Sequence, residues 1–470
     1  MEPEELAGAI TRLVEWAERN TPRPQSPLQR RLREHFGEDP VDLPVVSRSL
    51  EAWDRPNVQV AIDAWLEGQE FEVIGVSLMA GYRAGLGELV RGGEWAAETQ
   101  LGGAEHVTVP LGGQESITCV QSGLWLVRVG DEPVVVMLKS SDMGGGEQLG
   151  LEVMARERAQ AEEIVVQLRR LMNERNIYRG RVLELRPRHF HDDQGAPLTV
   201  RSLPEIGREQ IVLAEGVLEA IERQAFGIAR HAKRLRASGR HLRRGLLLHG
   251  PPGVGKTLTA MYLATQMPGR TVVLLTGQGL GAVSASVDLA TALQPAMVIL
   301  EDVDLVAMER SFEPTNAILF ELLNAMDGLD EDHDVLFVLT TNRADLLEPA
   351  LAARPGRVDQ AVELPLPDSS ARRRLLQLYG EGLGVEFDGS DRLVADLHGT
   401  TPAFIRELLR RAALLAAEES DDGPLRVGHR HLDDALDELR LAGGELTQTL
   451  LGAQSPTSHD ANPGDLRDDG

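Results

Sequence analysis

The sequence predicts an α/β protein in which a parallel-sheet domain is followed by a helical domain and preceded by helical and α+β modules. Apolar strand patterns alternate with helical patterns over residues 205–367, which is typical of a mainly parallel sheet covered by helices. A glycine-rich loop at residues 250–257 stands between the first of these strands and a helical pattern. Residues 369–442 lose strand character and show several helical runs, which indicates a separate helical domain.

Length and composition restrict the class of protein. The 470 residues exceed what one hydrophobic core usually serves. The 73 acidic and 48 basic residues leave a formal charge of -25, which disfavours a protein that coats nucleic acid. The single cysteine, Cys119, excludes an intramolecular disulfide framework and fits a reducing compartment. The first residues lack a secretory pattern and no apolar run approaches the ~20 residues that span a bilayer, so we expect a cytoplasmic protein without a membrane partner.

Changes of pattern along the chain predict its division. Five segments are expected: a mostly helical region (1–95), an α+β domain (96–200), the parallel-sheet domain (204–367), a helical domain (368–446) and a disordered acidic tail (447–470). Within the α+β domain we expect strands at 116–120, 124–129 and 133–138, a helix at 151–175 and a closing strand at 182–185. The parallel sheet is expected to contain strands at 246–248, 271–275, 296–300 and 335–339.

The loop Gly250-Pro-Pro-Gly-Val-Gly-Lys-Thr257 has the spacing of a phosphate-binding loop. Its glycines let successive backbone N–H groups point at phosphates, and the following helix N-terminus adds favourable partial charge. Lys256 would reach the β- and γ-phosphates of a nucleotide, and the Thr257 hydroxyl would bind Mg²⁺. A chance glycine loop is a poor alternative because the required strand and helix flank the motif. The nucleotide-binding residues expected here are Pro252, Gly253, Val254, Gly255, Lys256, Thr257 and Leu258.

Paired carboxylates, Glu301 and Asp302, end the strand expected at 296–300. Such a pair can hold Mg²⁺ and polarise an attacking water, although strand ends also carry solvated charge. The usual order is Asp followed by Glu, and here the order is reversed. Glu301 therefore takes the metal-side position, and Asp302 offers a catalytic carboxylate that is one methylene shorter. Hydrolysis at such a site could be slow.

Three further side chains follow the strand at 335–339. Asn342 at its tip could hold the attacking water or contact a γ-phosphate. Arg354 and Arg357 could reach the γ-phosphate of a neighbouring subunit, where such arginines contribute ~10³–10⁵ in rate. The alternative is a surface arginine pair bonded to nearby acidic residues such as Asp345 or Asp359.

Together these motifs resemble the AAA clade of the AAA+ ATPases, from about residue 204 to 441. The resemblance implies Mg-ATP as cofactor, a helical lid over residues 368–446, and a homo-oligomeric, usually hexameric, ring. It implies that Asn342 is the first sensor residue and that Arg354 and Arg357 are arginine fingers. The residues implied to enclose the adenine and ribose are Gly227, Ile228, His398 and Ala403. The family's Gly-Ala pair at the last position is Pro402-Ala403 here.

Departures from the family pattern leave the biological role open. The loop at 276–281 lacks the aromatic pore residue of AAA unfoldases. The short route from this loop to Glu301 and the sequence Leu-Glu-Asp-Val-Asp resemble the mitochondrial Rieske-protein translocase branch, whereas the domain order resembles soluble bacterial AAA proteins. No His-Glu-x-x-His zinc motif is present. The leading hypothesis is an ATPase that remodels a protein or complex recognised by residues 1–200. An ATP-dependent assembly switch or scaffold with slow hydrolysis is the alternative.

A nucleic-acid remodeller is the least favoured hypothesis, although residues 230–244 hold seven basic and no acidic residues. We expect this basic segment to face the nucleotide and a neighbouring acidic subunit, or to form a solvated helix face.

Overall fold

The computed structural model describes residues 26–77, 84–91, 100–142, 147–185, 198–240, 242, 244–276, 282–304, 322, 324–326, 333–345, 358–385, 390–419 and 424–441. The chain divides into two compact units. The N-terminal unit comprises residues 1–177 and 188–197, and the C-terminal unit comprises residues 178–187 and 198–470. The predicted tail at 447–470 lies outside the described residues.

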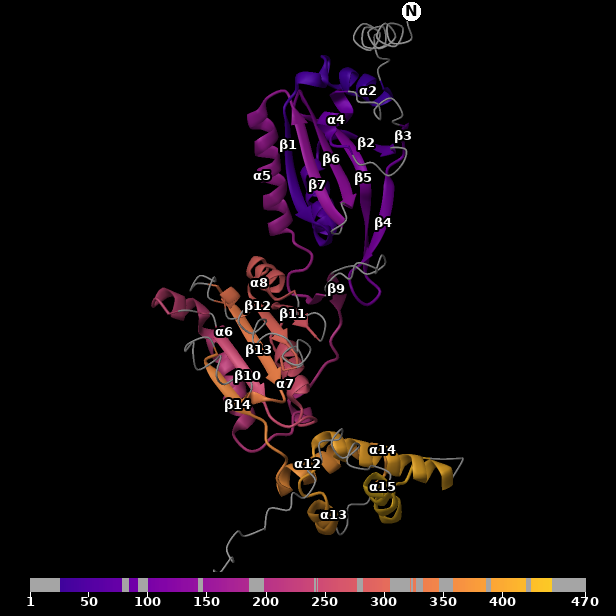
Figure 1. The fold of residues 1–470 in the computed structure, drawn as a ribbon, viewed down its shortest axis with the longest axis vertical. Coiled ribbons are helices and arrows are strands. Elements are labelled where there is room, and N and C mark those ends of the chain that lie inside the picture. The colour runs from indigo at the N-terminus through magenta and orange to yellow at the C-terminus, as the bar shows by residue number, and fades with distance from the viewer. Residues whose placement is uncertain are drawn as a thin grey trace, which may run out of the picture. The chain divides into compact units, whose positions relative to one another are not determined.

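The N-terminal unit is built on an antiparallel sheet with the order β1-β7-β6-β5-β2-β3, and β4 pairs with β5 (Figure 1). Its strands are β1 (Val45–Glu51), β2 (Glu70–Ser77), β3 (Gln100–Gly102), β4 (Glu105–Pro110), β5 (Ser116–Val129), β6 (Glu132–Asp142) and β7 (Glu147–Ala155). Its helices are α2 (Pro27–Phe36), α3 (Arg55–Leu66), α4 (Leu86–Arg91) and α5 (Arg158–Glu174). The β5–β6 hairpin turns at Gly130, whose φ of 65° suits a residue without Cβ.

Side-chain alternation along the central strands creates two hydrophobic cores. On β5, Trp125 and Val127 pack with α3 and α5, whereas Leu124 and Leu126 pack with α2 and α4. Because neighbouring strand residues point to opposite faces, the continuous apolar pattern of β5 and β6 serves both cores. Helices therefore cover both faces of this sheet.

Two expectations for the N-terminal part of the chain are corrected. The boundary expected between residues 95 and 96 is absent because β1 and β2, from the region expected to be mostly helical, pair with β7 and β5. The helix expected at 151–175 begins only at Arg158. Leu151, Val153 and Ala155 face one core and Met154 the other, which is a strand period of two residues.

The C-terminal unit contains a second sheet with the order β14-β10-β13-β12-β11-β8-β9. Its strands are β8 (Val182–Leu185), β9 (Leu198–Arg201), β10 (Arg244–His249), β11 (Thr271–Leu275), β12 (Ala296–Leu300), β13 (Val335–Thr341) and β14 (Gln360–Glu363). The pairs from β14 to β8 are parallel, and β8 and β9 are antiparallel. The four strands expected for this sheet are confirmed as β10 to β13. The strand at 182–185 is corrected, since β8 pairs with β11 here rather than closing the N-terminal unit.

Three described helices flank this sheet and four follow it (Figure 1). The flanking helices are α6 (Val217–Ala237), α7 (Lys256–Thr265) and α8 (Val283–Ala292). The four that follow pack around a separate hydrophobic core, and we call them the lid helices. They are α12 (Ser369–Tyr379), α13 (Ser390–Asp396), α14 (Pro402–Glu419) and α15 (His429–Leu441). Val212, from the segment before α6, packs into this lid core, whereas its neighbour Ile211 packs into the sheet core.

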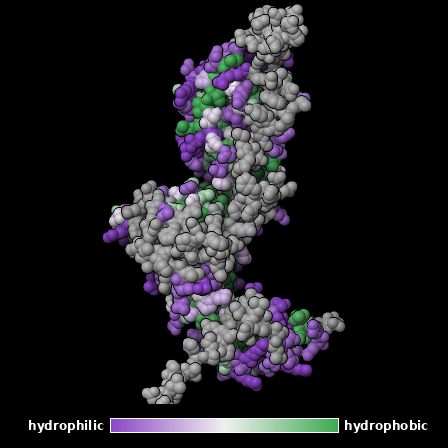
Figure 2. Space-filling view, in the orientation of Figure 1, coloured by the Kyte–Doolittle hydropathy of each residue, from purple (hydrophilic) through white to green (hydrophobic). Residues whose placement is uncertain are grey.

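The described surface is mainly hydrophilic over the lid helices in the view of Figure 2. Large exposed apolar side chains among the described residues are few and scattered, and they include Phe71, Val166 and Leu414. No described helix combines the length and the apolar character needed to cross a bilayer.

A buried ion pair gives a test of the N-terminal unit. Glu152 accepts from Lys139 Nζ at 2.7 Å and from the Leu86 backbone N–H at 2.6 Å, and its side chain is 7% exposed. We expect Glu152→Ala to lower the free energy of unfolding by about 3 kcal/mol, because it leaves a half-buried ammonium without its partner. The measurement is urea unfolding followed by tryptophan fluorescence. All five tryptophans precede residue 126, so this signal reports on the N-terminal unit.

The matched control is Glu162→Ala on α5, which removes an exposed pair with Arg158. Its expected effect is within about 0.5 kcal/mol. Equal effects of the two substitutions would contradict a stabilising role for the buried pair.

Candidate functional site

The carboxyl ends of β10, β12 and β13 meet at one edge of the parallel sheet, and a glycine-rich loop lies there between β10 and α7. Gly253 and Gly255 have φ values of 80° and 101°, a region that residues with a Cβ rarely adopt. Gly255 directly precedes α7, so the loop ends on a helix N-terminus, where backbone N–H groups favour an anion. Within the loop, Val254 is buried and Pro252 is exposed, and Thr257 and Leu258 at the start of α7 are also exposed.

Lys256 connects this loop to the neighbouring strand. Its Nζ donates to the carbonyl oxygens of Gly250 at 2.9 Å and Pro251 at 2.8 Å, and to Asn342 Oδ1 at 2.7 Å. The three bonds match the three donors of an ammonium group. Burial lowers the pKa of Lys256, and the carboxylates of Asp302 and Asp304 oppose that shift.

Asp302 follows β12 in a backbone conformation that few non-glycine residues adopt, with φ of 47°. Hydrogen bonds to β13 hold it there. Its N–H donates to Thr340 Oγ1 at 3.0 Å, and the N–H of Val303 donates to the Thr340 carbonyl at 3.0 Å. Asn342 Nδ2 donates to Asp302 Oδ1 at 3.3 Å, so the amide lies between the ammonium and the carboxylate. Unusual backbone conformations of this kind concentrate at functional sites.

Asp304 is a positioning residue that the sequence analysis did not single out. Its side chain is buried, and Oδ1 accepts from the Thr341 hydroxyl at 2.8 Å and from the Asn342 N–H at 3.1 Å. The carboxylate therefore fixes the backbone that carries the Asn342 amide. The signal was present in the sequence, as a third acidic residue two positions after Asp302.

Glu301 and Thr257, which neighbour Asp302 and Lys256 in the chain, offer further oxygen atoms to this site. Burial raises the pKa of Glu301, the Thr257 hydroxyl lowers it through a hydrogen bond, and the charge of Asp302 raises it. Glu301 Oε1 is buried and has no hydrogen-bond partner among the described residues. Mg²⁺ prefers carboxylate and hydroxyl oxygens, so an unpaired carboxylate oxygen beside a hydroxyl fits this ion.

The lid contacts the loop directly. The N–H of Ala403, at the start of α14, donates to the Gly253 carbonyl at 3.2 Å. A Cβ at residue 253 would lie 3.0 Å from Ala403 Cβ and 3.1 Å from Thr401 Oγ1, so glycine allows this approach. His398 is exposed three residues before Thr401, and its side chain makes no hydrogen bond to the described loop.

Comparison with known proteins agrees with this geometry. Residues 246–366 match the model of the ATPase family associated with various cellular activities, AAA. This part of the chain is an AAA domain. The predicted family and the predicted fold class are therefore confirmed.

Curated relatives of the AAA domain include three kinds of protein. A segment of 215 residues is 34% identical to proteasome-activating nucleotidase 2 of Halobacterium salinarum, covering 42% of this chain and 51% of the relative. Over 253 residues it is 32% identical to the ATP-dependent zinc metalloprotease FtsH 1 of Sphaerobacter thermophilus, covering 50% and 38%. A 26S proteasome regulatory subunit S10B homolog of Arabidopsis thaliana is 30% identical over 194 residues, covering 38% and 48%. The chain thus spans about half the length of these relatives or less.

The structure places Gly227 and Ile228, which were expected beside the nucleotide, within α6. The nearby carbonyl of Ala225 accepts from Arg244 Nη2, at the amino end of β10. Gly227 and Ile228 therefore lie toward the edge of the sheet opposite to the phosphate loop. The segment that connects the AAA domain core to the lid core is instead Ile211–Val212. Ile211 and Val212 are only two adjacent apolar residues in a loop, so the sequence did not indicate that they connect the two cores.

The described residues of the basic segment 230–244, which was expected to face the nucleotide, also lie toward the edge of the sheet opposite to the phosphate loop. Its helical part is the end of α6, and Arg244 opens β10 at the edge opposite to the phosphate loop. Arg354 and Arg357 lie outside the described residues, as do residues 277–281 of the loop after β11.

Removal of the Asp304 carboxylate tests its positioning role. Asp304→Ala leaves the buried Thr341 hydroxyl and the Asn342 N–H without an acceptor, at a cost of about 3 kcal/mol. We expect the melting temperature of the C-terminal unit to fall by roughly 6–12 °C, measured by calorimetry. Asp345→Ala, which removes an exposed ion pair with Arg343, should lower the melting temperature far less. An unchanged melting temperature for Asp304→Ala would exclude the role.

Proposed function

We propose that the protein binds Mg-ATP at the phosphate loop, hydrolyses it, and uses the reaction to remodel a protein or a protein complex. The observation that carries the proposal is the hydrogen-bonded chain from Lys256 through Asn342 to Asp302. It brings a cation, an amide and a carboxylate from three sequence regions to one edge of the sheet, which is the arrangement that phosphoryl transfer to water needs.

The residues divide into groups that bind the phosphates and groups that act on water. Lys256 would exchange its bonds to the loop carbonyls for bonds to the β- and γ-phosphates. Thr257 and Glu301 would hold the metal ion through their oxygen atoms. Bound Mg-ATP supplies the phosphoanhydride bond and, through its ion, offsets negative charge on the phosphates.

Asp302 is placed to act on the attacking water. Its carboxylate would accept a proton from that water at an oxygen atom, and the Asn342 amide would orient both groups. The backbone hydrogen bonds from Asp302 and Val303 to Thr340 keep the short carboxylate in position. Because Asp is one methylene shorter than Glu, we expect slow basal turnover.

A ring of identical subunits, hexameric by the family resemblance, would complete the site. Arg354 and Arg357 of a neighbouring subunit would stabilise the charge that develops on the γ-phosphate. The names of the relatives support action on proteins, since two of them are proteasomal and one is a protease. The N-terminal unit would then recognise the macromolecular partner, and the cytoplasm is the proposed compartment, supported by a buried, unpaired Cys119.

An ATP-dependent assembly switch is the second candidate, and one observation favours it. All three Lys256 donors are satisfied by the protein itself, and α14 of the lid donates to the loop at Gly253. Nucleotide binding would have to rearrange the Lys256 bonds, and the contact between Gly253 and Ala403 would transmit a change in the loop to the lid. Turnover that a protein partner stimulates many-fold would favour the remodelling ATPase, and a slow rate that no partner changes would favour the switch.

Two substitutions separate binding from hydrolysis. We expect Lys256→Ala to abolish binding of a fluorescent ATP analogue, because the ammonium group is the main cation of the loop. Asp302→Asn should retain binding within about twofold and lose at least about 100-fold in turnover, because the amide cannot accept the proton. Binding is measured by fluorescence titration and turnover by phosphate release.

Arg223→Ala serves as the control for both measurements, since this exposed residue lies on α6 and should change neither quantity. Full turnover in Asp302→Asn would overturn the assignment of the catalytic carboxylate. Unchanged binding in Lys256→Ala would overturn the assignment of the nucleotide site itself.

The raised pKa of Glu301 predicts a pH dependence of metal binding. The ion requires the ionised carboxylate, so its affinity should fall as the pH decreases through the raised pKa, at a higher pH than for an ordinary glutamate. Asp302→Asn removes a charge that contributes to the shift, and the fall should move to lower pH. The measurement is the Mg²⁺ dependence of ATP-analogue binding between about pH 5 and 8. Glu301→Gln should lack the transition, and a transition that persists there would assign it to another group.

A further inference from the structure

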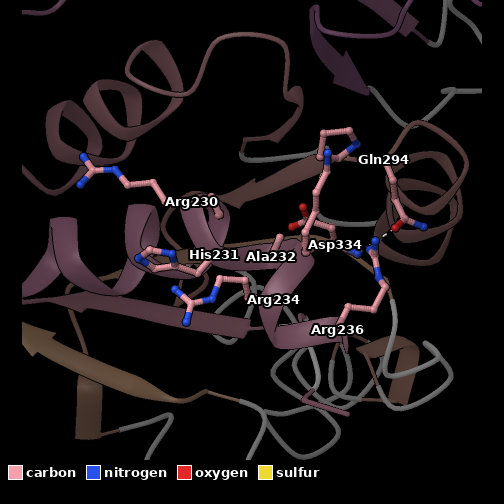
Figure 3. A pocket seen from close by; sticks show the side chains of 10 residues that line it. Arg230, His231, Ala232, Arg234, Arg236, Gln294 and Asp334 are labelled. Carbon is pink, nitrogen blue, oxygen red and sulfur yellow. Dashed lines mark hydrogen bonds between the residues drawn. The ribbon is translucent and has the colours of Figure 1, made fainter. Parts of the chain in front are cut away.

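A pocket lies at the amino ends of β12 and β13, at the edge of the sheet opposite to the phosphate loop. It has a volume of about 470 Å³ and lies between the last turns of α6 and the residues that precede β12 and β13. Six of the residues that line it are Arg230, Lys233, Arg234, Arg236, Gln294 and Asp334. Figure 3 shows Arg230, His231 and Arg234 projecting from one side of the helix, and Arg236 extending toward Gln294.

Among the described residues at this end of the sheet, two buried guanidinium groups face one partly buried carboxylate. Asp334 pairs with Arg270, with distances of 3.0 Å and 3.1 Å, and also with Arg244 at 3.4 Å. Both arginines are buried and share the carboxylate of Asp334, and the exposed Asp359 also acts on Arg244 through its charge. Arg244 Nε has no hydrogen-bond partner in the described structure, and burial together with Arg270 lowers the pKa of Arg244 to about 10.

Three exposed cations of the pocket also carry charge without an acidic partner among the described residues. Arg230, Lys233 and Arg234 form no ion pair within the described part of the chain. They lie at positions i, i+3 and i+4 of α6, where like charges destabilise a helix. The first turns of α6 differ, since Glu219 and Glu222 both bind Arg208 there. No acidic residue occurs between Arg223 and Arg240, in a chain that carries a formal charge of -25.

We propose that this pocket binds a small polyanion with more than one phosphate group. Arginines one helical turn apart can contact two successive phosphates, each through charge-assisted hydrogen bonds. The anion would relieve the repulsion along α6 and balance the excess charge of Arg244 and Arg270. The volume suits a small molecule, whereas an acidic peptide or a nucleic acid needs an extended groove.

The pocket is separate from the proposed ATP site. Arg244 and His249 are the two ends of the six-residue strand β10, and a strand of this length spans about 17 Å. Asp334 directly precedes β13 and Asn342 directly follows it, so the whole length of that strand separates these two residues. A ligand in the pocket therefore cannot contact Lys256, and the proposal does not depend on ATP hydrolysis.

The test uses inorganic tripolyphosphate as the probe, the full chain and isothermal titration calorimetry. Lys256→Ala is introduced into every sample so that the phosphate loop does not contribute. We expect binding at one site, and addition of Arg230→Ala and Arg234→Ala should weaken it at least about tenfold, because two charge-assisted contacts are lost. Arg223→Ala with Arg240→Ala removes two exposed charges that do not line the pocket, and should change the dissociation constant by less than about twofold.

All four substituted arginines are exposed, and circular dichroism verifies that the variants remain folded. Absence of tripolyphosphate binding in the Lys256→Ala protein would overturn the proposal. Equal weakening by the two arginine pairs would also overturn it, since that result indicates a general charge effect. Tighter binding of a single-stranded oligonucleotide or a glutamate-rich peptide at the same arginines would assign the surface to a macromolecule instead.

Discussion

The buried ammonium group of Lys256 is the interaction on which the arrangement of the candidate site depends. It binds two carbonyls of its own loop and the amide oxygen of Asn342, and so connects β10 to β13. Because the amide oxygen faces a donor, the amide nitrogen faces Asp302, and the orientation of Asn342 is determined. Asp304 and Thr340 then hold the backbone on each side. The acidic, amide and basic groups are thus positioned as one hydrogen-bonded unit.

Parallel strands explain why this unit and the basic pocket lie at opposite edges of one sheet. β10, β12 and β13 run in the same direction, so all of their carboxyl ends reach the phosphate loop and all of their amino ends reach Arg244, Gln294 and Asp334. Each edge gathers charge from residues far apart in the sequence. The phosphate-loop edge combines one lysine with three carboxylates, whereas the pocket edge has an excess of arginine.

Local patterns in the sequence were sufficient to predict the phosphate loop, Glu301, Asp302 and the four central strands, because each depends on residues close together in the chain. Features that depend on distant partners were not predictable in this way. Val182–Leu185 has the same apolar pattern in either sheet, and only its pairing with β11 places it in the C-terminal unit. Leu151–Ala155 is compatible with a helix until β6 and β1 are known to flank it. Gly227 was expected beside the adenine from the family resemblance, and the sequence alone did not show that it lies within the long helix α6.

Because the N–H of Ala403 donates to the Gly253 carbonyl, we propose that the phosphate loop and the start of α14 receive the nucleotide together. Hydrogen–deuterium exchange of the Asp302→Asn protein, with and without Mg-ATP, tests it most directly, because bound phosphates accept hydrogen bonds from backbone N–H groups. We expect slower exchange at residues 250–258 and 401–405, with no change over the last turns of α6. Unchanged exchange at the loop, or protection confined to α6, would contradict it.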